Sequence, residues 1–251
     1  MRRGLTIAMV GIVLLFCVAI AVVYVSISSV ITSTIEKYGS AMTQTAVTLT
    51  EADFSPTTGE ATLVNLKVES PVPFVSQPSL LAPRIDIQID PHSIGKETVI
   101  IKRLKIEAPE ITYEITKSSD NLRTIRERIE DAVAAEKSGP FPPDRKGPVK
   151  RFIINDLYII NGVVIVQAEN LTGYRETALL EDLHLENLGQ EENGLEPAAL
   201  IERIYTSILQ ATTLAALSTD LNLSDQTRNI LRGASDETEE LIDHLRNLLE
   251  K

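Results

Sequence analysis

The chain is short of several residue types, and each shortage narrows the class of protein. It contains no tryptophan and a single cysteine, Cys17, so no disulfide framework holds it together. Basic residues are outnumbered, because 24 lysines and arginines stand against 35 acidic residues, a formal net charge of -11. That balance argues against binding to nucleic acid and against a general attraction to anionic lipid headgroups. Because no disulfide can contribute, the stability of the fold must come from a hydrophobic core.

Charged residues are missing altogether between Arg3 and Glu36. Within this stretch, residues 5–27 are apolar and, at about 1.5 Å per residue, long enough to cross a hydrocarbon core of about 30 Å. We therefore predict a transmembrane helix over residues 5–27. A cleaved signal peptide is the alternative, but the apolar run exceeds the usual length of about 7–15 residues. Arg2 and Arg3 precede the span, so we expect residues 1–4 in the cytoplasm and the bulk of the chain on the other side.

Beyond the span, apolar spacing predicts a helical stalk over residues 28–44, and the period then switches to two. Residues 84–90 alternate isoleucine with polar residues, which is typical of a half-buried strand. This β domain is expected over residues 45–190. The predicted strands are 46–53, 60–69, 84–90, 98–107, 110–116, 151–160, 163–168 and 177–186.

Most joins between these strands are short and contain turn residues. Ala108-Pro109 and Asn161-Gly162 are predicted turns, and Asn-Gly between apolar runs is the strongest hairpin signal in the chain. Parallel strands need a crossover of about a dozen residues or more, so loops this short predict an antiparallel meander. The expected fold class is α+β: a transmembrane helix, then an antiparallel β-meander forming a curved sheet or groove, with covering helices and a helical C-terminus.

Helical periodicity interrupts and follows the strands. An inserted helix and a proline-rich linker are expected over residues 120–148, with Asp120 as the helix N-cap. Pro197 suits the first position of a later helix that ends near Leu217. Residues 191–251 are thus a helical C-terminal region, which either packs on the chain's own sheet or binds a partner.

One phrase occurs four times, as NLKVESP, RLKIEAP, DLYIING and DLHLENLG. Aligned on Leu66, Leu104, Leu157 and Leu183, each copy has an apolar residue two positions later, which places both on one strand face. The leucines are 38, 53 and 26 residues apart, and such unequal steps exclude a solenoid of fixed period. We interpret the phrase as one kind of strand used again in successive hairpins.

The order of these segments resembles the N-terminal region of the AsmA family of bacterial envelope proteins. In that family a first strand ends in a turn, which is followed by a phenylalanine and by a strand of alternating isoleucine and aspartate. A proline-centred strand and an Asn-Leu pair come next. The resemblance covers roughly residues 5–190 of this chain, which is far shorter than the large members. The matching positions are Gly59, Leu66, Val68, Pro71, Phe74, Ile85, Ile87, Ile89, Ile106, Pro109, Ile111, Tyr113, Glu114, Asn121 and Leu122.

The resemblance implies a single-pass protein of the bacterial inner membrane, with a cytoplasmic N-terminus and its bulk in the periplasm. Large members form long β-grooves with apolar interiors and are implicated in moving phospholipid toward the outer membrane. We therefore expect a role in cell-envelope and outer-membrane lipid homeostasis, with the lipid bilayer and a phospholipid as partners. The alternative is a membrane-anchored scaffold or assembly factor that binds a protein partner through its C-terminal helices.

The apolar face of the predicted strands is the candidate site. Either it lines a groove that holds an acyl chain, or it is core covered by the predicted helices. Residues 152–154 and 163–166 are apolar on both faces and need cover on both sides. The candidate lipid-facing residues are Ile85, Ile87, Ile89, Leu104, Ile106, Ile111, Tyr113, Leu157, Ile159, Val164 and Val166.

Motifs that carry catalysis are missing from the sequence. It has no Gly-x-Ser-x-Gly motif, no glycine-rich phosphate loop after a strand, and no His/Cys set with metal-ligand spacing. The three histidines, His92, His184 and His244, stand far apart in polar turns or on charged faces, so we expect them at the solvated surface. We therefore expect no enzyme activity, no metal ligand and no cofactor.

Overall fold

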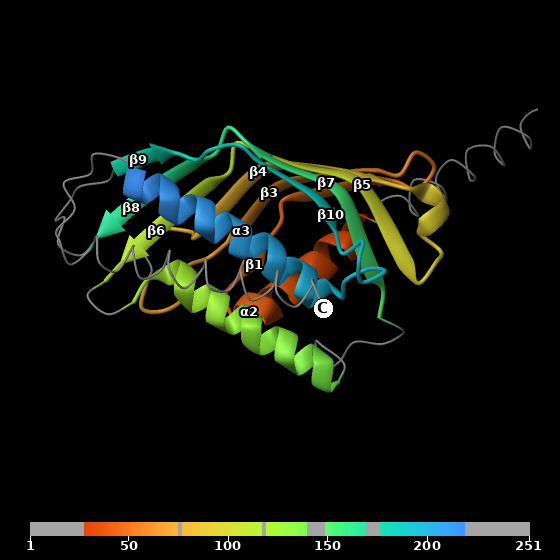
Figure 1. Cartoon of the computed structure of the whole chain (residues 1–251), viewed down its shortest axis with the longest axis horizontal. Coiled ribbons are helices and arrows are strands. Elements are labelled where there is room, and N and C mark those ends of the chain that lie inside the picture. Colours follow the sequence, from red (N-terminus) through yellow and green to blue (C-terminus); the bar gives the residue numbers. More distant parts are fainter. Residues whose placement is uncertain (1–27, 75–76, 117–118, 140–148, 169–175, 219–251) are drawn as a thin grey trace, which may run out of the picture.

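A computed structural model describes residues 28–74, 77–116, 119–139, 149–168 and 176–218. One sheet arches over three helices, which lie together on its concave side (Figure 1). These helices occupy residues 28–43, α2 (Asn121–Ser138) and α3 (Pro197–Ser218). Among the described residues, no helix combines the length and the hydropathy that a membrane crossing requires. The predicted span at 5–27, linker residues 140–148 and everything after 218 lie outside the described residues.

The sheet contains ten strands and is mixed. Three predicted ranges, 98–107, 151–160 and 163–168, coincide with strands to the residue, whereas the range 177–186 is split between two strands. The strands are β1 (Val47–Thr48), β2 (Glu51–Ser55), β3 (Glu60–Val68), β4 (Leu80–Ile89), β5 (Thr98–Glu107), β6 (Glu110–Ile115), β7 (Arg151–Ile160), β8 (Val163–Ala168), β9 (Glu176–Leu179) and β10 (Leu183–Leu188).

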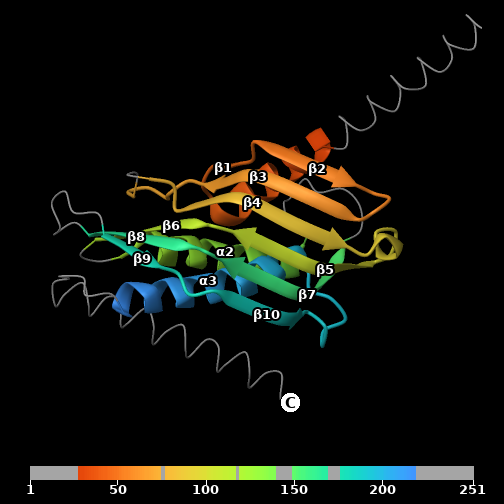
Figure 2. The ribbon, with the colours of Figure 1, turned by 90° about the horizontal axis from the view of Figure 1, so that it is seen from above.

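Several pairs of consecutive strands lie end to end in the sheet (Figure 2). We call each such pair, or a single strand that has no end-to-end neighbour, a strand line. Strand β4 pairs with β5 along its later half and with β6 at its start, so β5 and β6 follow one another along the same edge of β4. Strand β7 pairs with β5 and β8 pairs with β6, both in parallel, while β10 and β9 pair antiparallel with β7 and β8. The sheet therefore has six strand lines, namely β1/β2, β3, β4, β5/β6, β7/β8 and β10/β9.

The predicted antiparallel meander is wrong at two joins. Ala108-Pro109 and Asn161-Gly162 do not turn the chain back, because β5 continues into β6 and β7 continues into β8. Asn161 has φ 56° and Ala108 has φ 50°, and one left-handed residue at each join kinks the backbone, after which the strand resumes its direction. The chain returns instead through α2 and the segment after it, which is long enough for a parallel crossover.

The kinks at Ala108 and Asn161 belong to one crease that crosses the whole sheet. Ala108 N–H donates to the carbonyl of Ile160 at 2.9 Å, and Leu180 N–H donates to that of Gly162 at 2.9 Å, so the interruptions of neighbouring lines lie side by side. In a regular strand, residues that face the same side are an even number of positions apart. At the crease, the core-facing residues on either side are an odd number of positions apart in every strand line. The steps are Leu49 to Ala52, Leu63 to Leu66, Ala82 to Ile85, Ile106 to Ile111, Ile159 to Val164 and Leu180 to Leu183.

The crease explains how the sheet arches without exposing its apolar residues. Alternation is interrupted at the same level in all six lines, and the core-facing residues on both sides of the interruption stay on the concave face. A second interruption crosses β5 and β7, where the pairing skips Lys102 and Asn155. As a result Ile154 and Leu157, three residues apart on β7, are both fully buried at 0% exposure.

The repeated phrase marks neighbouring strands. Partners in the β5/β6 and β7/β8 lines are always 53 residues apart, with Leu104 beside Leu157 and Ile111 beside Val164. The second and third copies therefore lie in parallel register, which corrects the interpretation as successive hairpins. The fourth copy runs antiparallel to the third, with Leu185 opposite Leu157.

The core lies between the concave face and the helices. Residues of β7 and β8 pack with Leu209 and Ala216 of α3, while Met42 packs with Ile125 and Ile129 of α2. The helix at residues 28–43 also covers β2–β4, through Ile31 and Ile35. The predicted N-cap of α2 is confirmed, since the Asp120 carboxylate accepts a hydrogen bond from the Arg123 N–H at 2.7 Å.

Truncating a leucine should lower the free energy of unfolding much more in the core than at an exposed position of the sheet. Leu157→Ala removes a fully buried side chain and should lower the free energy of unfolding by about 2–5 kcal/mol. Leu179→Ala, at a leucine that is 83% exposed, should change it by less than about 0.5 kcal/mol. Urea unfolding of the detergent-solubilised full chain, followed by circular dichroism, measures both. Equal losses would contradict the assignment of the core.

The crease predicts a stabilising glycine. Ala108 is exposed and left-handed, a conformation that glycine adopts without steric strain, so Ala108→Gly should raise the free energy of unfolding by up to about 1 kcal/mol. The control Ala134→Gly, at an exposed interior position of α2, should lower it by about 1 kcal/mol. The same urea titration measures both, and a loss at Ala108 would contradict the left-handed conformation assigned to this residue.

Candidate functional site: the helix-free face of the sheet

The predicted lipid-facing residues all lie on the concave face, beneath the helices. Four of them are partly buried and pack against the core: Ile87, Ile89, Leu104 and Ile106. The other seven are at most 5% exposed: Ile85, Ile111, Tyr113, Leu157, Ile159, Val164 and Val166. An acyl chain could reach these seven only if a helix moved away from the sheet.

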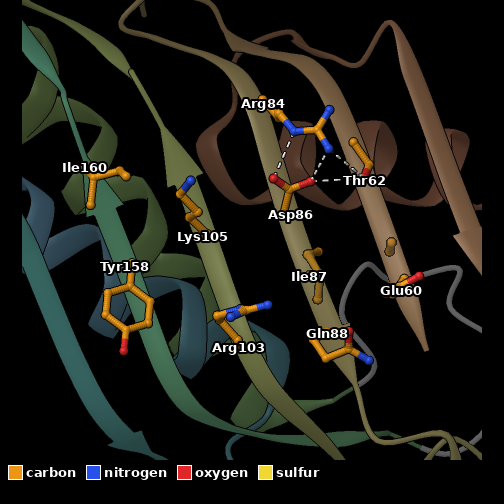
Figure 3. Close-up of a pocket in the computed structure, with 11 residues that line it drawn as sticks. Glu60, Thr62, Arg84, Asp86, Ile87, Gln88, Arg103, Lys105, Tyr158 and Ile160 are labelled. Atoms are coloured by element: carbon orange, nitrogen blue, oxygen red, sulfur yellow. Dashed lines mark hydrogen bonds and ion pairs between the residues drawn. The ribbon is translucent and has the colours of Figure 1, made fainter. Parts of the chain in front are cut away.

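The opposite face, which we call the outer face, carries two rows of polar side chains across five strands. Its side chains point away from the helices, which lie behind the sheet in Figure 3. This face contains a shallow hollow of about 690 Å³, whose lining includes Arg84, Arg103 and Tyr158. The first row is Thr62, Asp86, Lys105, Tyr158 and His184, and the second row is Glu60, Gln88, Arg103, Asp156 and Glu186.

Charges on the outer face are organised in pairs along the strands. The Arg84 guanidinium holds the Asp86 carboxylate through two contacts, Nε to Oδ2 at 2.9 Å and Nη2 to Oδ1 at 2.6 Å. The hydrogen bond from Arg84 is the main reason that the pKa of Asp86 lies below its usual range. Lys105 Nζ similarly lies 3.0 Å from Glu107 Oε2. Exposed pairs of this kind contribute little to stability, so they chiefly fix where charge is displayed.

At the β10 end of the outer face, three potential ligands meet. His184 Nε2 lies 2.9 Å from Asp156 Oδ1 and 3.8 Å from Glu186 Oε1. The His184 ring stacks on Tyr158, with centroids 4.2 Å apart and planes inclined by 12°. His184 is exposed, as expected, but no sequence pattern links it to Asp156, which is 28 residues away. The available signal was that His184 and Glu186 share one face of a predicted strand.

A second polar cluster is buried and joins α2 to the sheet. The Asn121 side chain, 0% exposed, donates to Ser79 Oγ at 2.9 Å and to the Thr112 carbonyl at 2.8 Å. Its oxygen accepts from the Glu114 N–H at 2.9 Å. These bonds fasten the start of α2 to β6 and to the residue before β4. The Asn121 side chain therefore has a structural role.

Asp120, beside Asn121, is a buried carboxyl whose pKa is raised. Its side chain is 0% exposed, and burial raises its pKa above the ordinary value of 3.8, although the Arg123 N–H and guanidinium offset part of the rise. A raised carboxyl pKa means that the folded chain binds the proton more tightly than the unfolded chain. The charged form therefore destabilises the fold, increasingly as pH rises from about 3.8 through the folded pKa.

Asp120→Asn should remove this pH dependence while keeping the helix cap, because asparagine caps as well as aspartate does. The free energy of unfolding of the variant, relative to the natural chain, should increase as pH rises above about 4. Asp131→Asn, at an exposed position of α2, reports the effect of losing one carboxylate alone. Urea titrations at several pH values between about 4 and 8 provide the measurement. A difference that shrinks with rising pH would refute the burial argument.

No protein-family model matches the chain, and no curated protein matches its sequence.

Proposed function

We propose that this protein is an AsmA-like, non-enzymatic scaffold of the bacterial cell envelope, anchored in the inner membrane by residues 5–27 and binding a protein partner in the periplasm. The anchor and the compartment are supported by the apolar run and by the resemblance of the sequence. The partner is supported by one structural observation: the chain's own helices fill the apolar face of the sheet, whereas no element of the described residues covers the two polar rows of the outer face.

The two candidate functions differ in which face of the sheet must be accessible. Holding an acyl chain requires an open apolar face, yet Leu157 and Val164 beneath the helices are 0% exposed. Binding a protein requires an accessible surface with defined charges, which the two rows of the outer face supply. The second function is therefore the better supported.

The one C-terminal helix among the described residues packs on the chain's own sheet. The described helix, α3, uses its apolar side against the sheet, where Leu209 is 2% and Ala216 is 0% exposed. Residues 219–251, the rest of the predicted helical C-terminal region, lie outside the described residues. We therefore assign the partner to the outer face.

A link to lipid homeostasis remains part of the proposal, as an accessory role. Six strand lines about 4.8 Å apart span about 25 Å across the sheet. A conduit built from such strands would have to be several times longer to cross the envelope. The protein would therefore act on lipid traffic through its partner.

Photo-crosslinking in the native membrane tests this proposal. The full chain carries a photoreactive residue at Lys105 on the outer face or at Leu104 on the concave face, and Lys137, exposed on α2, is the control. We expect a discrete protein adduct from position 105, with none from 137 and no phospholipid adduct from 104. Phospholipid captured at 104, with no protein captured at 105, would overturn the proposal in favour of an acyl-chain groove.

A further inference from the structure

The edge of the outer face brings together three groups that favour the same ligand. Strands β7 and β10 are antiparallel, with Glu186 opposite Asp156 and His184 opposite Tyr158. His184 and Glu186 are two residues apart on β10, so their side chains point to the same side of the sheet. One imidazole and two carboxylates, from two adjacent strands, therefore converge on one point in front of the sheet.

The distances between these groups suit a tetrahedral cation. Zinc binds nitrogen and oxygen at about 2.0–2.2 Å, which places tetrahedral ligand atoms about 3.4 Å apart. The distances from His184 Nε2 to Asp156 Oδ1 and to Glu186 Oε1, 2.9 Å and 3.8 Å, lie on either side of that value. All three ligand atoms lie within 4.8 Å of one another. Small side-chain rotations would therefore complete the coordination.

The surroundings hold the ligands in place and fit the charge. Asp156 is on β7, which is paired on both sides, with β5 and β10. Tyr158 stacks on the His184 ring and thereby restricts its orientation. Two carboxylates balance a divalent charge. The imidazole favours zinc and related transition metals over magnesium and calcium, which prefer oxygen ligands alone.

We infer that Asp156, His184 and Glu186 form a site for a divalent transition-metal cation, best suited to zinc. The cation ties the edge strand β10 to the interior strand β7. Because a bound ligand stabilises the state that binds it, zinc should stabilise the folded chain. The three side chains are 39%, 40% and 63% exposed, so a fourth coordination position faces solvent. This inference does not depend on the proposed partner.

Zinc titration of the metal-free, detergent-solubilised full chain tests the site. Isothermal calorimetry should give one zinc ion per chain, and cobalt in its place should give the visible absorption of a tetrahedral complex. His184→Gln should weaken zinc binding by at least about tenfold, as should Glu186→Gln. Zinc should raise the melting temperature of the natural chain and leave that of His184→Gln unchanged.

Two controls keep the test decisive. His92→Gln removes an exposed histidine at η1 (Pro91–Ser93) and should leave zinc binding unchanged. Arg103→Gln removes a positive charge paired in register with Asp156 and should tighten binding. Both altered ligands are exposed, and circular dichroism verifies that the variants fold. Binding to His184→Gln as tight as to the natural chain, or no binding by the natural chain, would overturn the site.

Discussion

The packing of three helices against one creased sheet is the contact on which the rest of the structure depends. A strand that alternates strictly can bury one face, but a one-residue slip sends every later side chain to the other face. In this sheet the backbone makes such a slip in all six lines at the same level, and the apolar pattern of the sequence shifts by one residue at the same place. The apolar residues before and after the slip therefore both face inward. The crease thus bends the sheet over its helices and keeps one continuous core.

This arrangement decides where a function can lie. Because the helices at 28–43, α2 and α3 occupy the concave side, the surface that the sheet offers to other molecules is the outer face (Figure 3). Its side chains come from strands held in register by the core beneath them, so charges on β3 and on β10 keep fixed relative positions. A protein partner and a metal ion both require such fixed positions.

The sequence predicted the elements better than their pairing. Apolar runs bounded by turn residues placed β5, β7 and β8 to the residue, and Asp120 marked the start of α2. Asn161-Gly162 misled because its chemistry permits a left-handed residue either in a hairpin or at a kink between two strands that continue in one direction, and only the pairing of neighbouring strands decides between them. The apolar character of both faces at 152–154 and 163–166 was the signal for parallel strands. The metal-ligand set could not be predicted, because the β7–β10 register brings it together.

Cysteine accessibility along β7 tests the closed core and the crease pattern most directly. Single cysteines at positions 154 to 159 of a full chain lacking Cys17 would be treated with a maleimide in the native membrane. We predict labelling at 155, 156 and 158 and protection at 154, 157 and 159, since Ile154 and Leu157 are 0% and Ile159 is 1% exposed. Two adjacent labelled positions are the mark of the interruption at Asn155. Labelling at 157 and 159 equal to that at 156 and 158 would contradict the account, because it would mean an open apolar face.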